Sequence, residues 1–133
     1  MEPTLRREEE MEWAVAPLHH RLFQKTLISP EESNELKLHL WKILREKIDP
    51  GGAVLPHTHD VTEVIYFTQG EVAALLGEKR MHCRPGDAIV APAGVVHGVA
   101  NKGNTASEQI SFFIPEIDNN NFGHTRLVLE ENI

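Results

Sequence analysis

The chain has 133 residues and a formal net charge of −7, and 41% of its residues are hydrophobic. These values are typical of one globular domain with a single core. The sequence contains no run of lysine or arginine, so we expect no nucleic-acid partner, because phosphate binding needs clustered positive charge. It also lacks any apolar stretch near the ~20 residues that span a bilayer. We therefore expect no membrane partner.

The first residues of the chain are strongly charged. Residues 1–17 include the run RREEE and lack the apolar segment of a secretion signal, so we expect a cytoplasmic location. We predict that they form an arm ahead of a single domain over residues 18–133. The single cysteine, Cys83, excludes an internal disulfide, and we expect it to be a buried small apolar residue.

The first strand is predicted over residues 18–29, where both faces carry some apolar residues. His19 and His20 lie at the edge of this strand. We expect both to be solvated rather than metal ligands, because no carboxylate lies at a matched spacing. Residues 29–34, with the sequence SPEESN, predict a turn.

Two interpretations compete over residues 36–48. Apolar residues recur there at helical spacing, and the lysine, leucine, arginine and glutamate residues favour a helix. Leu36, Leu38 and Leu40 alternate instead as they would in a strand. The sequence PGG at residues 50–52 predicts a turn after this segment.

The remainder of the chain predicts short strands that are separated by turns. The predicted strands cover residues 63–68, 72–76, 79–83, 88–91, 108–114 and 125–129, besides a strand that carries His97. Residues 118–121, with three consecutive asparagines, predict a loop. Because no long helix is clearly indicated, this pattern favours an all-β barrel or sandwich.

Three histidines and one glutamate have spacings that can converge on one metal ion. His57 and His59 are two residues apart, which places both imidazoles on one face of a strand. Glu63 follows a short polar stretch that predicts a bend, and such a bend would return its carboxylate to the two rings. His97 joins this set only if the chain folds back across these strands. Imidazole and carboxylate ligands suit divalent transition metals.

The residues around this set resemble the two sequence motifs of the cupin family. The first motif, G-x5-H-x-H-x3-E-x6-G, matches from Gly51 to Gly70. The second motif, G-x5-P-x-G-x2-H-x3-N, matches from Gly86 to Asn101. Every fixed position of both motifs is filled, which makes the resemblance specific for the fold and for a metal site, although not for a reaction.

This resemblance implies an all-β fold, the double-stranded β-helix or cupin jelly-roll barrel. It implies that His57, His59, Glu63 and His97 bind one divalent transition metal, which could be Fe, Mn, Zn, Ni or Co. It also places a strand directly before residue 50, so we predict a strand over residues 36–48.

The resemblance further implies a metal-dependent enzyme of the dioxygenase, decarboxylase, isomerase or lyase type, with a small polar acid or a sugar-derived molecule as substrate. One alternative is a non-catalytic protein that binds a small ligand through its metal. Another is a barrel whose metal only stabilises the fold. Single cupin domains also imply a homodimer, formed through edge strands or exchanged N-terminal segments.

Several side chains are candidates for the surroundings of the metal, although none stands out as catalytic. The predicted strand before residue 50 would present Trp41, Ile43 or Arg45 to the barrel interior. Histidine ligands need an acceptor for their second ring nitrogen, and the nearby candidates are Thr58, Asp60, Thr62 and Gln69. The candidates for contacts with a bound ligand are Tyr66, His82, Arg84, Phe67 and Phe112.

Overall fold

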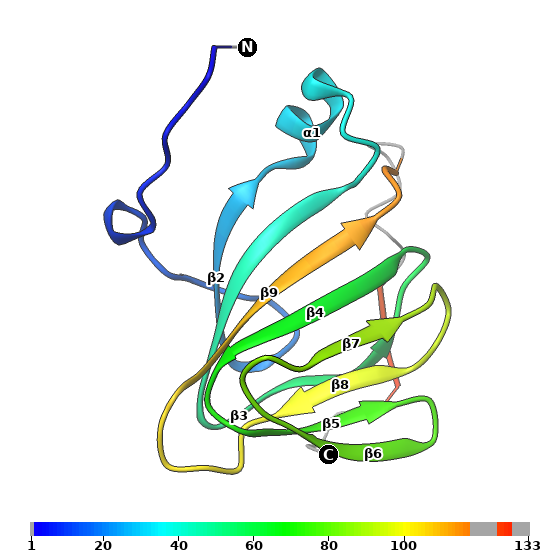
Figure 1. Ribbon diagram of the computed structural model, residues 1–133. Coiled ribbons are helices and arrows are strands. Elements are labelled where there is room, and N and C mark those ends of the chain that lie inside the picture. The colour runs from blue at the N-terminus through cyan, green and yellow to red at the C-terminus, as the bar shows by residue number, and fades with distance from the viewer. Residues whose placement is uncertain (1, 118–124, 129–133) are drawn as a thin grey trace.

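The computed structural model describes residues 2–117 and 125–128. The strands form a nearly closed antiparallel barrel of two facing layers, with a short helix at one end (Figure 1). The predicted all-β cupin-like barrel is thereby confirmed. The described elements are η1 (Glu8–Glu10, a 3-10 helix), β1 (Ala14–Val15), β2 (His20–Ile28), α1 (Pro30–Leu36), β3 (Lys42–Thr58), β4 (Thr62–Gln69), β5 (Val72–Leu76), β6 (Lys79–Cys83), β7 (Ala88–Ala91), β8 (His97–Ala100), β9 (Ser107–Ile114) and β10 (Arg126–Leu127).

The long strand β3 connects the two layers of the barrel. Its first half, residues 42–48, pairs with β2 and β9. Its second half pairs with β8, so that His57 lies opposite His97. β4 and β7 continue the first layer beside β9, whereas β5 and β6 continue the second layer beside β8. The two segments that carry the distant histidines are therefore neighbours in the sheet.

The predicted turn over residues 50–52 is wrong, because β3 runs through this segment. Gly51 has a φ of +82°, a left-handed conformation that glycine adopts at little cost. Backbone pairing continues through the bend: the Gly51 N–H donates to the Asn101 carbonyl, and the Asn101 N–H donates to the Gly52 carbonyl, each over 3.0 Å. The glycine therefore bends the strand from one layer into the other without reversing it.

The segment before β3 is an α-helix rather than the predicted turn over residues 29–34. The Ser29 hydroxyl accepts a hydrogen bond from the Glu32 N–H, and the Glu32 carboxylate accepts one from the Ser29 N–H. This reciprocal capping box starts the helix, and Lys37, with a φ of +56°, ends it. Because β3 begins only at residue 42, the strand prediction over residues 36–48 holds for its second half alone.

The other predicted strands lie close to their predicted bounds. The strand predicted over residues 125–129 is found as the short β10, which pairs with β3. Residue 129 and the predicted loop over residues 118–121 lie outside the described residues. Cys83 is buried, as predicted.

The apolar interior between the layers keeps the walls of the barrel in place. Ile48, Ile65, Phe67 and Val99 are each at most 1% exposed and belong to the main core cluster. Burial of a large apolar side chain contributes roughly 1.5–3 kcal/mol to folding, so this cluster stabilises the strands on which the site is built. Among the helices of the described residues, none has the length and hydrophobicity needed to cross a membrane.

Candidate metal centre

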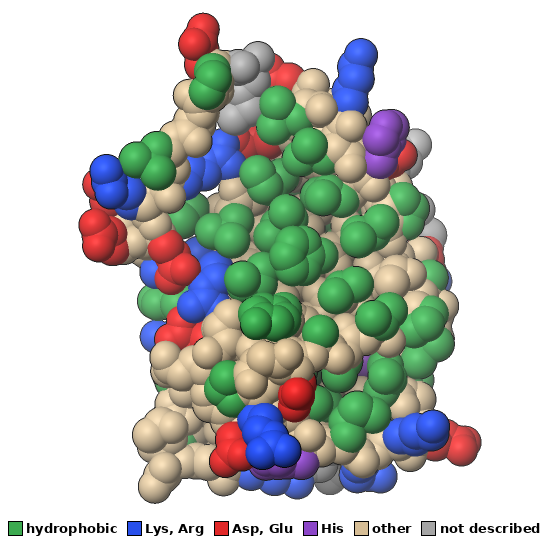
Figure 2. All heavy atoms as spheres, viewed as in Figure 1, with side chains coloured by type: hydrophobic (Ala, Val, Ile, Leu, Met, Phe, Trp, Pro, Cys, Tyr) green, Lys and Arg blue, Asp and Glu red, His purple; other side chains and the backbone are tan. Residues whose placement is uncertain are grey.

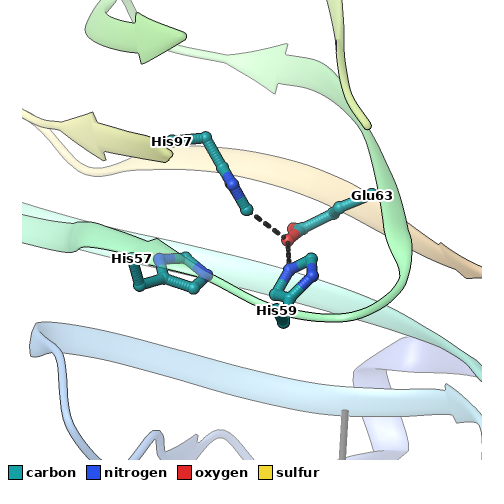
Figure 3. Close-up of side chains that lie close together, drawn as sticks. All are labelled: His57, His59, Glu63 and His97. Atoms are coloured by element: carbon teal, nitrogen blue, oxygen red, sulfur yellow. Dashed lines mark hydrogen bonds and ion pairs between the residues drawn. The ribbon is translucent and has the colours of Figure 1, made fainter. Parts of the chain in front are cut away.

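The predicted set of three histidines and one glutamate comes together inside the barrel (Figure 3). His57 lies at the end of β3 and His59 just beyond it, Glu63 lies near the start of β4, and His97 starts β8. One ligand atom from each residue lies within 4.8 Å of the others, and all four residues are at most 4% exposed. Ligands about 2.1 Å from one ion lie no more than about 4.2 Å apart, so small side-chain rotations would close this set around a divalent transition metal.

A backbone carbonyl holds the second ring nitrogen of each histidine. The pairs are His57 Nδ1 with Leu55 O at 2.7 Å, His59 Nδ1 with Val61 O at 2.7 Å, and His97 Nδ1 with Val95 O at 3.0 Å. When such a ring is neutral, a proton on Nδ1 leaves Nε2 as the nitrogen that can bind a metal. In the metal-free protein, Nε2 of His59 and of His97 contacts Glu63 instead. The prediction that side chains would supply these acceptors is wrong for all its candidates, which were Thr58, Asp60, Thr62 and Gln69.

Glu63 is the negative charge of the cluster. Its Oε1 lies 3.0 Å from Nε2 of His59 and 3.1 Å from Nε2 of His97. Burial opposes its ionisation, but the hydrogen bonds from these two rings outweigh burial and hold the pKa of Glu63 below its usual range. Burial and the charge of His97 lower the pKa of His57 to about 3. His57 is therefore a neutral imidazole at neutral pH, which is the form that binds a metal.

Three residues of the cluster, His57, His59 and Glu63, line a cavity of about 150 Å³. A space of this size holds a molecule of about six non-hydrogen atoms, such as benzene. The residues that line it are Pro17, Leu18, His19, Gln24, Trp41, Lys42, Leu44, Glu46, Val54, His57, His59, Glu63, Phe113 and Thr125. The cavity therefore combines metal-binding, aromatic and charged groups.

A family model described as "Cupin domain" matches residues 44–113, which include all four cluster residues. The chain belongs to the cupin family. A search of curated protein sequences finds no match.

Solved structures share the fold of this cupin. A predicted oxalate decarboxylase from Thermotoga maritima has a TM-score of 0.73 and 22% identity, with 84% of this chain and 99% of that chain covered. The polyketide cyclase RemF from Streptomyces resistomycificus has a TM-score of 0.77 and 19% identity, with 97% and 87% covered. An oxalate oxidase in complex with the substrate analogue glycolate has a TM-score of 0.66 and 21% identity, with 85% and 57% covered. At such identities these likenesses show the common fold alone.

The cavity of this cupin contains a second buried carboxylate, which sequence analysis missed. Glu46 is 4% exposed and lies on β3 between Gln24 of β2 and Gln109 of β9. Its Oε1 accepts hydrogen bonds from Ser111 Oγ at 2.5 Å and Gln109 Nε2 at 3.2 Å, and its Oε2 accepts one from Gln24 Nε2 at 3.2 Å. Burial and the charge of Glu63 outweigh these bonds and raise the pKa of Glu46.

His19 lies in the cavity wall, although the sequence predicted a solvated side chain. Its ring centroid is 5.1 Å from that of His57, and its Nδ1 accepts a hydrogen bond from the Leu55 N–H at 2.9 Å. Burial lowers the pKa of His19 to about 4, so the ring is neutral at pH 7 and its proton sits on Nε2. His20 is exposed, as predicted.

The side chains that were predicted to contact a ligand do not line this cavity, and that prediction is wrong. Phe67 is buried in the main core. Tyr66, His82 and Arg84 are exposed on other surfaces. Phe112 lines a groove on the outer face of the barrel.

The prediction that Trp41, Ile43 or Arg45 faces the barrel interior is only partly correct. Trp41 lines the cavity, as predicted. Ile43 lines the outer groove, and Arg45 forms ion pairs on the outer face. Because alternate residues of a strand face opposite sides, Lys42 and Glu46 face the cavity instead.

Proposed function

We propose that this cupin is a metal-dependent enzyme that acts on a small polar acid. The proposal is supported by the buried cluster of three imidazoles and a carboxylate, of which His57, His59 and Glu63 line a cavity. In this proposal His57, His59, Glu63 and His97 hold one divalent transition metal, and Fe, Mn, Zn, Ni and Co all suit the ligand set. Four protein ligands on a six-coordinate ion leave two positions for water or substrate.

A bound metal of this kind supplies Lewis-acid polarisation of a substrate oxygen. The protein supplies orientation, exclusion of water and places for protons. Trp41 and Phe113 meet edge to face, with 5.7 Å between ring centroids, and form an apolar wall. Glu46 holds a proton more firmly than an exposed carboxyl does, and His19 presents an N–H donor. These groups suit decarboxylase, dioxygenase, isomerase or lyase chemistry.

Two observations support an acid as the substrate. The cavity of about 150 Å³ is small, which favours a compact acid over a sugar derivative. Two of the similar structures are named as a predicted oxalate decarboxylase and an oxalate oxidase with bound glycolate, and the molecules in those names are small acids.

Turnover by the reconstituted protein tests this proposal. The protein is loaded with each candidate metal in turn and offered a panel of small hydroxy and oxo acids, while oxygen uptake and carbon dioxide release are followed. We expect turnover with at least one metal and one acid, and none for His59→Ala. Binding of metal and acid without turnover would instead support a non-catalytic ligand-binding protein.

We also propose that two chains form a homodimer through the outer face of the first layer. Figure 2 shows hydrophobic side chains gathered over β3, β9 and β4. A groove on this face is lined by Leu27, Ile43, Ile110 and Phe112 and is bordered by residues 2–4. A second copy presents the same apolar face, so the contact can be two-fold symmetric.

Sedimentation equilibrium tests the dimer. We expect a species of twice the 15.0 kDa chain mass for the wild type and a 15.0 kDa species for Phe112→Asp. A monomeric wild type would contradict the dimer without affecting the metal site. The division into an arm over residues 1–17 and a barrel over residues 18–133 stays a prediction, as does the cytoplasmic location.

A further inference from the structure

Lys42 brings an unpaired positive charge into the cavity. Its Nζ lies 4.1 Å from the ring centroid of Trp41 and 5.0 Å from that of Phe113. Across residues 2–117 and 125–128, this ammonium makes no hydrogen bond or ion pair. An ammonium has three N–H donors, and the aromatic faces attract its charge without offering it an oxygen acceptor. The two rings therefore attract the charge to this part of the cavity, while its hydrogen-bonding capacity remains available.

The neighbouring carboxylates are already engaged by other groups. Burial lowers the pKa of Lys42, while the charges of Glu46 and Glu63 oppose this effect. Glu63 is hydrogen-bonded by two cluster histidines and would become a metal ligand. Glu46 accepts three hydrogen bonds, and its burial favours the protonated form. With Glu46 protonated and Glu63 ionised, Lys42 and a divalent ion would leave a net positive charge in the cavity, which an anionic ligand would reduce.

We infer that Lys42 binds the carboxylate of the substrate and makes the site selective for small organic anions over neutral molecules of the same shape. This inference rests on the proposed function and narrows its substrate class to the anion of a small carboxylic acid. Gln24 and Glu46 lie on the same wall of the cavity and are placed to contact a hydroxyl of that acid. Trp41 and Phe113 position the ammonium rather than the reacting atoms.

Glycolate and its uncharged amide, glycolamide, are the probes for this inference, because they have nearly the same size and differ in charge. Titration calorimetry on the metal-loaded protein measures the affinity for each. We expect the wild type to prefer glycolate. Lys42→Met should weaken glycolate binding by about tenfold to a hundredfold, the loss of one charge-assisted hydrogen bond, and should change glycolamide binding little.

Lys47 provides a matched control on the same strand. Its Nζ lies 5.0 Å from the ring centroid of Trp13 and 5.2 Å from that of Phe23, but Lys47 does not line the cavity. Lys47→Met removes the same charge and should leave glycolate affinity unchanged. Lys42→Arg, which keeps the charge, should bind glycolate more tightly than Lys42→Met.

The metal content of the same samples separates the two ways in which the inference could fail. Glycolate affinity of metal-loaded Lys42→Met within twofold of the wild type would overturn the role of Lys42 and leave the proposed function intact. Equal wild-type affinity for glycolate and glycolamide would likewise overturn the role of Lys42 and leave the proposed function intact. A wild type that takes up no metal would overturn both the proposed function and the inference.

Discussion

The two faces of strand β3 carry similar charged side chains in very different surroundings. On the inner face, Lys42 and Glu46 line the cavity, and among the described residues neither forms an ion pair within 4 Å. On the outer face, Arg45 pairs with Glu8 over 2.9 Å and with Glu108 over 2.5 Å. Within the described part of the chain, the same strand therefore presents an ammonium and a carboxyl group without ion-pair partners on its inner face, and paired charges on its outer face.

This difference indicates on which face of β3 a charge has a role other than pairing. Ion pairs near the surface form at little cost and contribute little free energy. The partly buried ammonium of Lys42 lacks such a partner among the described residues and loses some of its solvation, which supports its proposed role in binding. We therefore expect substitutions on the inner face to change binding and pH dependence, and those on the outer face to have small effects.

The largest effect is expected at the cluster of the four proposed metal ligands, which lies inside the barrel. A metal that binds only the folded protein stabilises it by about 4 kcal/mol at a thousandfold excess over Kd. We expect saturating metal to raise the free energy of unfolding by that amount, and a chelator to reverse the change. Urea denaturation measures both, with His97→Ala as the variant that should not respond. Wild-type unfolding curves that coincide with and without metal would contradict the metal centre.

The next largest effect is expected at Glu46 in the metal-free protein. Its pKa in the folded protein is raised above the ordinary value of 4.5, so the folded chain keeps a proton that the unfolded chain has already lost. The wild type therefore loses stability as the pH rises from 4.5 through the folded-state pKa. Glu46→Gln removes this loss and should raise the free energy of unfolding at high pH by about 1–3 kcal/mol.

Glu108 is the matched carboxylate on the outer face. It lies in an ion pair with Arg45, so Glu108→Gln should bring no gain in stability at high pH. Urea denaturation across the pH range compares both variants with the wild type. A pH profile of Glu46→Gln that runs parallel to the wild-type profile would show that Glu46 ionises like an exposed carboxyl.

The smallest effect is expected from the outer ion pair itself. The side chains of Arg45 and Glu108 are 13% and 20% exposed. A double-mutant cycle with Arg45→Met and Glu108→Gln should give a coupling energy of at most about 1 kcal/mol, and added salt should reduce it. A coupling of several kcal/mol, insensitive to salt, would remove the contrast between the two faces.

The cluster could be predicted from the sequence, whereas the rest of the cavity could not. The i, i+2 spacing of His57 and His59 places both rings on one side of a strand, and the second motif brings in His97. The inward face of residues 42–48 has no such signal, because both faces combine charged and apolar side chains. Hydrophobic alternation therefore could not show that Glu46 faces inward.

The structure also differs from the sequence predictions at α1 and at His19. The first difference has a local cause and the second a long-range one. The S-x-x-E pattern at residues 29–32 is a capping-box signal for a helix start, so α1 could have been predicted from local sequence. His19 has no such signal. Its place beside His57 depends on how the chain enters β2, where Leu18 has a φ of +72° and Arg21 one of +50°, and such conformations are not evident from residue type.

Elemental analysis of purified wild type and His59→Ala, after dialysis against excess metal and then against metal-free buffer, tests the metal centre most directly. Circular dichroism on the same samples verifies the fold. We predict one metal per 15.0 kDa chain for the wild type and almost none for a folded His59→Ala. A folded His59→Ala with its full complement of metal would contradict the assignment of His57, His59, Glu63 and His97 as the ligands.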